Sequence, residues 1–320
     1  MFDVITIGGA LRDFTFYIKE GKLSEGQFIF PLDSKIQVQK AYFTNGGGAN
    51  NVAVGLARFG LKVALISRIG QDFSGQAILK NLKKNKIETK FVQIDPKLHT
   101  GVSVIVQKRG QGKVLFTFRG ANEKLEIRNL RLGISKWVYV AALTGNWENI
   151  LNRIFQPSNT KHSAFKIAWN PGAVQLAAGK KKLAKYLKRT GVLILNRHEA
   201  AQLLNQKPLK QLGGVKFKDQ IRNFLQEIHR LGPRIVAITC GRRGAFVYEG
   251  QKIYYRLTNG SKPKDATGAG DAFSSGFLAG LILFNDIKKA LKLGISNSGS
   301  VIRVVGAQEG LLDKKILKNL

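Results

Sequence analysis

The chain carries the segment Asp265-Ala266-Thr267-Gly268-Ala269-Gly270-Asp271-Ala272-Phe273, which leads into an apolar stretch, 273–284, that predicts an amphipathic helix. Small residues at 268–270 let backbone amides approach a ligand, and at a helix N-terminus such amides and the helix dipole form an anion site. Asp271 falls in the first turn, where a bound phosphate would repel its carboxylate. Its presence therefore calls for a chemical reason, such as taking a proton from an attacking hydroxyl. A bare Gly-x-Gly is as typical of a tightly packed, capped helix start, but the full string favours the anion site.

Short apolar runs alternate with helical patterns along the rest of the chain. Continuous apolar runs of this length are typical of central parallel strands that are covered on both faces. Helical periods lie between them, as at 50–59 and 76–85. This alternation predicts an α/β fold with a doubly wound sheet. The predicted strands are Val4–Ile7, Val63–Ile66, Val138–Ala142, Ile167–Trp169, Val192–Leu195 and Ile235–Thr239.

Two regions interrupt this alternation, at about 14–44 and 101–119. Both show period-two patterns without an intervening helix, as in Val102, Val104 and Val106, which predicts antiparallel strands. A small sheet inserted into an α/β core often forms a lid that excludes water during transfer chemistry. An extension of the main sheet's edge is the alternative. We find no repeat and no linker between independent domains, so we expect one domain over 1–320 with two lid insertions.

The composition excludes several classes of protein. Hydrophobic residues make up 44% of the 320 residues, which is enough to build a core. One cysteine excludes a disulfide scaffold, and four histidines without ligand-like spacing argue against a His-built metal site. The first residues show no leader pattern, and no apolar run approaches the roughly 20 residues that a bilayer needs. We therefore expect a cytoplasmic protein with no membrane partner.

The net charge is +32, from 52 Lys and Arg against 20 Asp and Glu. A basic surface of this size can bind nucleic-acid phosphates or attract an anionic small substrate. The lysines do not form one tail, however, and recur beside helical patterns, as at 180–182 and 288–289. Solvated helix faces explain this spread best, so we expect no nucleic-acid partner despite the charge.

The string at 265–273 resembles the C-terminal signature of the ribokinase-like (PfkB) carbohydrate kinases. Four further segments resemble the family's other motifs and occur in the family's order, so the resemblance covers almost the whole chain, up to Gly306. These segments are Asn45–Gly60, which begins Asn45-Gly46-Gly47-Gly48-Ala49-Asn50-Asn51, then Ile69–Gly75, Asn196–Glu199 and Thr239–Gly244. The resemblance implies a three-layer α/β/α sandwich with a mostly parallel central sheet and a small β-sheet lid. It also implies transfer of the γ-phosphate of ATP to a hydroxymethyl group.

The resemblance also implies roles for individual residues at the reacting centre. Asp271 is the implied general base, and the amides of Gly268, Ala269 and Gly270 are the implied anion hole for the transferring phosphoryl group.

On the acceptor side, the implied contacts are Asp13, Gly46, Gly47 and Asn51. Taken alone, Asp13 is more typical of a solvated loop, and Asn51 is more typical of a helix-start cap. Gly48 departs from the ribokinases proper, which carry a basic residue in this neighbourhood. Ribose itself is therefore not favoured as the acceptor.

On the nucleotide side, Asn196 and Glu199 resemble the pair that holds Mg²⁺ through water and aligns the triphosphate. Taken alone, Glu199 is more typical of a carboxylate in a helix's first turn. The remaining implied contacts are Thr239, Gly241 and Gly244 in the nucleotide-side turn, Asn297 at the adenine, and Asp265 and Thr267 in a loop for a monovalent cation such as K⁺. The cation assignment is the weakest, because cation dependence varies across the family.

Two features keep more than one interpretation. Arg119 ends a lid strand and either reaches the substrate or its transferring phosphate, which suits a guanidinium, or lies on the lid surface. The aromatic residues of the first insertion either form the lid's own hydrophobic face, which would suit a homodimer, or stack on a nucleoside base. These residues are Phe14, Phe16, Tyr42 and Phe43.

We therefore predict an ATP-dependent carbohydrate kinase that acts on a small polyhydroxylated acceptor. The first alternative keeps the chemistry and replaces the sugar by a nucleoside. The second is a catalytically idle homologue that binds nucleic acid through its positive surface. The intact Asp271 and anion-hole loop argue against the second alternative.

Overall fold

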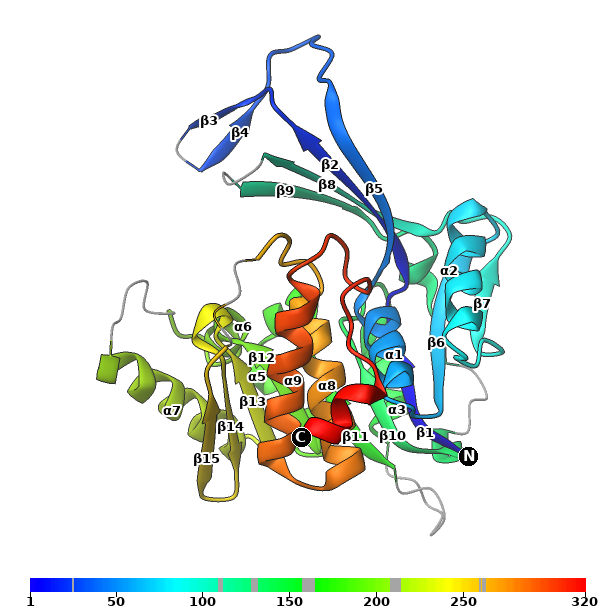
Figure 1. The fold of residues 1–320 in the computed structure, drawn as a ribbon. Helices are drawn as coiled ribbons and strands as arrows, with labels where there is room; N and C mark the ends of the chain where they lie inside the picture. Colours follow the sequence, from blue (N-terminus) through cyan, green and yellow to red (C-terminus); the bar gives the residue numbers. More distant parts are fainter. Residues whose placement is uncertain are drawn as a thin grey trace.

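The central sheet has nine strands in the order β15-β14-β13-β12-β11-β10-β1-β6-β7 (Figure 1). All pairs from β7 to β13 are parallel, whereas β14 and β15 extend the sheet in antiparallel pairing. The bounds are β1 (Phe2–Ile7), β6 (Val63–Gly70), β7 (Val92–Asp95), β10 (Ser135–Val140), β11 (Lys166–Trp169), β12 (Val192–Asn196), β13 (Ile235–Thr239), β14 (Ala245–Glu249) and β15 (Lys252–Arg256). All six predicted strands lie in the parallel part of this sheet, because their side chains are buried on both faces.

This computed structural model describes residues 1–24, 26–108, 112–127, 132–156, 165–207, 214–258, 260 and 263–320. Among these residues, no helix has both the length and the apolar character that crossing a membrane requires.

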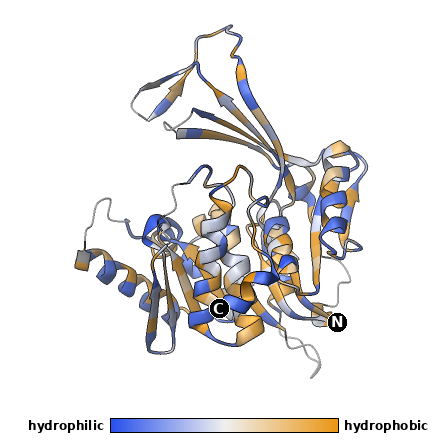
Figure 2. Cartoon of the chain, viewed as in Figure 1, coloured by the Kyte–Doolittle hydropathy of each residue, from blue (hydrophilic) through white to orange (hydrophobic). Residues whose placement is uncertain are grey.

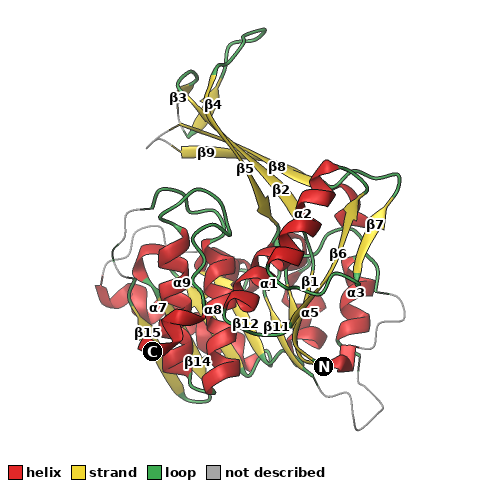
Figure 3. Ribbon diagram, turned by 45° about the vertical axis from the view of Figure 1, so that its right-hand side comes forward, coloured by secondary structure: helices red, strands yellow, loops and turns green. Residues whose placement is uncertain are grey.

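Helices cover both faces of the sheet and give three layers (Figure 3). One face packs against α1 (Gly48–Arg58), α2 (Phe73–Lys84), α8 (Ala269–Phe284) and α9 (Ile287–Val301). The other packs against α3 (Trp147–Ile154), α4 (Ala173–Ala177), α5 (Gly179–Leu187), α6 (Arg197–Leu203) and α7 (Gly214–Arg230). Alternate strand residues supply the two cores, as Val4 does on one face and Ile5 on the other. The predicted three-layer α/β/α sandwich is thereby confirmed.

A second, four-stranded sheet stands over the central one, in the order β5-β2-β8-β9 (Figure 1). Its strands are β2 (Leu11–Ile18), β5 (Val38–Gly46), β8 (Gly101–Lys108) and β9 (Gly112–Phe118), and a two-stranded ribbon of β3 (Lys22–Ser24) and β4 (Gln27–Ile29) extends it. Orange, hydrophobic stretches run along these strands as they do along the central sheet (Figure 2). We call this four-stranded sheet the lid.

The lid differs from the sequence prediction in two respects. Within each insertion the strands pair antiparallel, as expected, but β2 and β8 join the two insertions by parallel pairing. The first lid strand also begins earlier than predicted, so Asp13 lies inside β2 opposite Thr44 rather than in a loop after β1. Burial alternates along β2, with Leu11, Asp13 and Thr15 on the buried face, and this period of two extends the strand back to Leu11.

Candidate active site

The helix α8 begins at the glycine-rich string, as predicted. Gly268 is its N-cap, with a left-handed φ of 76°, and a Cβ at this position would lie 2.4 Å from the Cβ of Ala307. Only glycine combines that backbone conformation with so close an approach. A Cβ on Gly270 would meet nothing within 4 Å, so the space in front of the first turn is open. The amide of Ala269 donates to the carbonyl oxygen of Ala266 at 3.3 Å.

Asp271 lies in the first turn of α8 and contacts Asn51 of α1, 220 residues earlier in the chain. The Asn51 side-chain amide donates from Nδ2 to Asp271 Oδ2 at 2.8 Å. Asn51 is only 4% exposed and Asp271 is partly buried, so this hydrogen bond joins the interior to the edge of the site. The sequence prediction placed Asn51 against the acceptor; the structure places its amide nitrogen on the predicted base.

The surroundings of Asp271 raise the pKa of its carboxyl group. Burial raises the pKa of Asp271 to about 6, the hydrogen bond from Asn51 opposes this rise, and the negative charges of Asp13 and Glu199 add to it. A carboxylate with a pKa near 6 is ionised at neutral pH and still accepts a proton readily.

Asp13 lies on the lid strand β2, 5% exposed, and faces the core. Burial raises its pKa to about 6; a hydrogen bond with Ser103 lowers it, and the nearby charge of Asp265 raises it. Gly46 makes room for this carboxylate, because a Cβ at Gly46 would lie 2.2 Å from Asp13 Oδ2. Gly47, the next residue, is the N-cap of α1. The structure therefore brings Asn51 into direct hydrogen bonding with Asp271 and Asp13 close enough for its charge to act on it, with Gly46 beside Asp13 and Gly47 at the start of α1.

Asn196 and Glu199 form a capping box at the start of α6. Asn196 Oδ1 accepts hydrogen bonds from the amides of His198 and Glu199, and Glu199 Oε2 accepts one from the amide of Asn196. Burial raises the pKa of Glu199, and its charge influences Asp271. The capping box uses the carboxylate oxygen Oε2 of Glu199. Within the described ranges, no cluster of three or more His, Cys, Asp or Glu side chains is placed to hold a metal directly.

The nucleotide-side turn follows β13. Thr239 ends that strand, and Gly241 and Gly244 flank a short 3₁₀ helix, Gly241–Arg243, with φ values of 56° and 81°. Asn297 differs from its prediction. It is fully buried in α9, where Nδ2 donates to the carbonyl oxygen of Ala272 at 2.8 Å and Oδ1 accepts from the amide of Leu312 at 2.9 Å. With both ends of its amide engaged inside the fold, Asn297 holds α8 and α9 together, and we do not assign it to adenine.

Lys113 links the lid to the loop before α8. Its Nζ donates to Thr267 Oγ1 at 2.9 Å and lies 3.6 Å from Asp265 Oδ1. The Asp265 side chain is 2% exposed and also accepts hydrogen bonds from Thr267 and from the amide of Gly306. The Lys113 ammonium group therefore contacts Asp265 and Thr267, the two side chains that the sequence analysis assigned to a monovalent cation.

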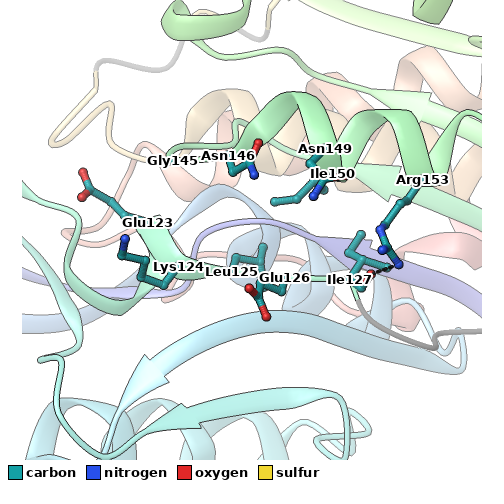
Figure 4. A pocket seen from close by; sticks show the side chains of 10 residues that line it. All are labelled: Glu123, Lys124, Leu125, Glu126, Ile127, Gly145, Asn146, Asn149, Ile150 and Arg153. Atoms are coloured by element: carbon teal, nitrogen blue, oxygen red, sulfur yellow. Dashed lines mark hydrogen bonds between the residues drawn. The ribbon is translucent and has the colours of Figure 1, made fainter.

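Arg119 follows β9, and its side chain is exposed. It lines a small cavity with Gly8 and Gly9, at the root of the lid. A much larger cavity, of about 670 Å³, lies between α3 and the segment 123–127 (Figure 4). None of its ten lining residues is among those that the sequence singled out, and Arg153 on its wall donates to the carbonyl oxygen of Ile127. We place the chemistry at Asp271 because the perturbed carboxylates gather there.

Sequence reasoning missed three polar residues at this centre. Lys113 and Ser103 come from lid strands, and Gln308 donates to Asn51 Oδ1 at 2.8 Å from the segment after α9. None of them belongs to a motif, and each reaches the site only through tertiary packing. The alternation along β8, which puts Ser103 on the Asp13 face, was the only available signal.

The model of the pfkB family of carbohydrate kinases matches residues 1–315. The chain is 25% identical over 259 residues to an uncharacterized sugar kinase of Archaeoglobus fulgidus, covering 81% of this chain and 98% of that one. It is 26% identical over 334 residues to an ATP-dependent 6-phosphofructokinase of Thermoanaerobacterium thermosaccharolyticum, covering 100% and 94%. The crystal structure of Methanocaldococcus jannaschii nucleoside kinase, an archaeal member of the ribokinase family, superposes with a TM-score of 0.79 at 23% identity, over 99% and 97%.

A three-layer α/β domain with a β-sheet lid and a carboxylate at a glycine-rich helix start defines a small-molecule kinase. The match along almost the whole sequence specifies which kind. This chain belongs to the pfkB family of carbohydrate kinases.

Proposed function

We propose that this kinase transfers the γ-phosphate of ATP to a hydroxymethyl group of a sugar or sugar-like acceptor, with Asp271 as the general base. One observation carries the proposal: Asp271 lies in the first turn of α8, with Oδ2 held by Asn51 and with the open N-terminus of the helix beside it. A hydroxyl next to Oδ1 would lose its proton to Asp271 as it attacks phosphorus. The amides of Gly268 and Gly270 would bind the charge of the transferring group, joined by that of Ala269 once it exchanges its 3.3 Å bond to Ala266 for the phosphoryl oxygen.

On the acceptor side, we propose that Asp13 accepts hydrogen bonds from substrate hydroxyls, with Gly46 and Gly47 leaving room for the acceptor. Asn51 already donates from Nδ2 to Asp271 and accepts at Oδ1 from Gln308, so only its second N–H and second lone pair are left for the acceptor. We therefore assign its main role to Asp271. Arg119, exposed at the lid root, is our proposed contact to the phosphate or to an anionic acceptor.

On the nucleotide side, we propose that Thr239, Gly241 and Gly244 border ATP and that Glu199 and Asn196 hold Mg²⁺ through water. Oxygen donors and retained water suit Mg²⁺, and a capping box with one carboxylate oxygen left over fits such an indirect site. When bound, Mg²⁺ would neutralise the triphosphate and align it. Asp265 and Thr267 remain our proposed contacts for K⁺, in competition with the Lys113 ammonium.

The register of the lid favours a sugar over a nucleoside stacked on Phe14 or Phe16. Both phenylalanines alternate with Asp13 along β2, so they point away from the face that carries Asp13. A nucleoside remains the second candidate acceptor, because the fold is shared with a nucleoside kinase.

We infer that the outer face of the lid binds a second copy of the chain. This face carries Phe43, Phe116 and Phe118, which are 59%, 58% and 54% exposed. Phe14 packs edge-on against Phe43 and extends the same apolar surface. A flat apolar sheet face is complementary to itself, and pairing two of them would bury these rings.

An acceptor screen that reports ADP release tests the proposed function. Wild-type protein with ATP and Mg²⁺ is offered pentoses, hexoses, sugar acids, sugar phosphates and nucleosides. We expect acceptor-dependent ADP release with at least one of the sugar-type compounds. No turnover with any acceptor, together with salt-sensitive binding of RNA, would instead indicate the idle nucleic-acid-binding homologue.

A further inference from the structure

A chain of side-chain amides runs from the C-terminal end of α2 to the predicted base. Asn85 Nδ2 lies 3.3 Å from Asn81 Oδ1, and Asn81 Nδ2 donates to Gln308 Oε1 at 2.8 Å. Gln308 Nε2 then donates to Asn51 Oδ1 at 2.8 Å, and Asn51 Nδ2 donates to Asp271 Oδ2 at 2.8 Å. This chain of amides thus connects four parts of the fold by hydrogen bonds: α2, α1, α8 and the segment that follows α9.

The direction of these hydrogen bonds is set at the far end. Asn85 Nδ2 also donates to the main-chain carbonyl oxygen of Asn81 at 2.9 Å, and a carbonyl oxygen can only accept. The oxygen of the Asn81 side chain must therefore face Asn85, and its nitrogen must face Gln308. Each amide in turn presents oxygen to the previous one and nitrogen to the next, so Asp271 receives a donor.

We propose that Gln308 and Asn81 are positioning residues that keep the Asn51 amide turned so that it donates to Asp271, and thereby keep Asp271 ionised as the base. The proposal rests on the role that the proposed function gives to Asp271. Among the described residues, the side-chain hydrogen bonds of Asn81 and Gln308 lead to each other, to Asn85 and to Asn51, and not to the first turn of α8, so each acts through Asn51. Gln308 is 3% exposed and Asn51 is 4% exposed, so water is not available to replace the missing partners.

The physical reason is the cost of the neutral form. The N–H of Asn51 stabilises a carboxylate more than a carboxylic acid, and Asn51 could favour the acid, by presenting Oδ1 to it, only by turning over. That turn would break the bond from Gln308 and set two N–H donors against each other. The chain of amides therefore disfavours protonation of Asp271, against the opposite influence of the groups that face it. The groups with that opposite influence are the carboxylates of Asp13 from β2 and Glu199 from α6, and the buried Tyr139 from β10, which also faces Asp271, has its own pKa raised by the Asp271 charge.

Two variants test the chain at different distances from the base. In Gln308→Met the donor to Asn51 is absent, so turning Asn51 over becomes easier. In Asn81→Asp a carboxylate faces Gln308 Oε1, so Gln308, and then Asn51, must reverse. Gln93→Met is the control, because Gln93 is a partly buried glutamine on β7 that bonds only to Glu126 among the described side-chain contacts.

We expect both variants to titrate Asp271 at a pKa higher by about one unit, which lowers its ionised fraction about tenfold on the acid side. The probe is the Asn51 side-chain N–H resonance, followed against pH by NMR in protein labelled with ¹⁵N-asparagine, a reading that needs no turnover. The kcat profile of the same variants should lose about fivefold at pH 6 and about tenfold at pH 5, and should recover above pH 8.

The outcomes separate this inference from the proposed function. Midpoints that rise in both variants and stay fixed in Gln93→Met support the chain of amides, whether or not an acceptor has been found. Midpoints within about 0.3 units of wild type would overturn it, even if wild-type turnover and its loss in Asp271→Asn behave as proposed. Absence of turnover in wild type bears only on the proposed function. Asn81 is partly exposed, so its variant should fold even if Gln308→Met does not.

Discussion

At the scale of single residues, the site consists of carboxylates that share a weakly solvated space. Asp13, Asp271 and Glu199 each have a raised pKa because of burial, and the charges of Asp13 and Glu199 raise that of Asp271 further. A bound substrate hydroxyl and a positively charged metal would relieve this repulsion. The free enzyme holds the carboxylates ready at some cost in stability.

The pH dependence follows from the folded-state pKa of Asp271, about 6 against an ordinary value of 3.8. The base must be ionised, so kcat should fall about tenfold per unit as the pH drops below 6. Stability should change in the opposite sense. A raised carboxyl pKa means that the native state binds the proton more tightly than the unfolded state, so stability declines as the pH rises from about 4 to 6.

Steady-state rates and melting temperatures over pH 4 to 9 measure both effects. Asp271→Asn serves as the control. Its amide does not titrate, so the stability of this variant should fall less than that of wild type as the pH rises from about 4 to 6. A kcat that stays constant between pH 7 and pH 5 would contradict the assignment.

Asp13→Ala should weaken acceptor binding and leave ATP binding nearly unchanged. Losing a hydrogen bond from a substrate hydroxyl to a buried carboxylate costs about 1–3 kcal/mol, which raises the acceptor KM about tenfold. Initial rates with each substrate varied in turn separate the two KM values. Asp219→Ala, on the exposed surface of α7, is the matched control. An unchanged acceptor KM would remove Asp13 from the acceptor site.

The motifs predicted which residues meet at the site but not how they contact one another. Gly268, Gly270 and Asp271 follow from local sequence, because a helix start needs only neighbouring residues. The bond between Asn51 and Asp271 spans 220 positions, and Gln308 reaches Asn51 over 257. Neither pairing has a sequence period that could indicate it. For the same reason the burial of Asn297 between α8 and α9 could not be foreseen.

At the scale of elements, the lid shows what periodicity can and cannot predict. Alternation along 101–108 and 112–118 correctly indicated strands, because a half-buried strand shows every second side chain to each face. The parallel pairing of β2 with β8 depends on where the preceding strands, β1 and β7, end in the central sheet. That pairing is a property of the assembled sheet, and no local pattern encodes it.

Lys113→Met tests the contact between the lid and the loop before α8. Without its ammonium, the buried Asp265 carboxylate lacks its nearest cation. We expect the variant to be stimulated by K⁺ more strongly than wild type, by about threefold or more, because an ion could replace the lost charge. Rates are compared in KCl and in choline chloride at equal ionic strength. Lys40→Met, an exposed lid lysine of β5, is the control. Equal stimulation of wild type and Lys113→Met would argue against this contact.

At the scale of the whole molecule, two surfaces remain to be matched with partners. The Lys and Arg residues behind the charge of +32 occur along the whole chain, on helices and on strands such as β5, whereas exposed aromatic residues gather on one face of the lid. The composition gives the positive charge directly but does not indicate which partner, if any, it serves. The second appears only once β2, β5, β8 and β9 are aligned, because their register places Phe14 beside Phe43 and Val104 beside Phe116.

Phe116→Lys should dissociate the lid-to-lid dimer. A charge at the centre of an apolar interface loses its hydration without gaining a partner, which costs several kcal/mol and shifts Kd by 10²-fold or more. Light scattering after size-exclusion chromatography measures the mass. Phe73→Lys, at an aromatic position on α2 that is even more exposed than Phe116, should stay dimeric if wild type is. A wild-type protein that is monomeric at tens of micromolar would refute the interface.

The most direct test of the whole account compares acceptor-dependent ADP release in wild type and in Asp271→Asn. The amide has nearly the same shape, so the fold and the amides of Gly268 to Gly270 should persist, and ATP and acceptor should still bind in calorimetry. It cannot take the hydroxyl proton, so kcat should fall by about 10²–10⁴-fold. A folded Asp271→Asn protein that binds both substrates and keeps more than about a tenth of wild-type turnover would contradict Asp271 as the base.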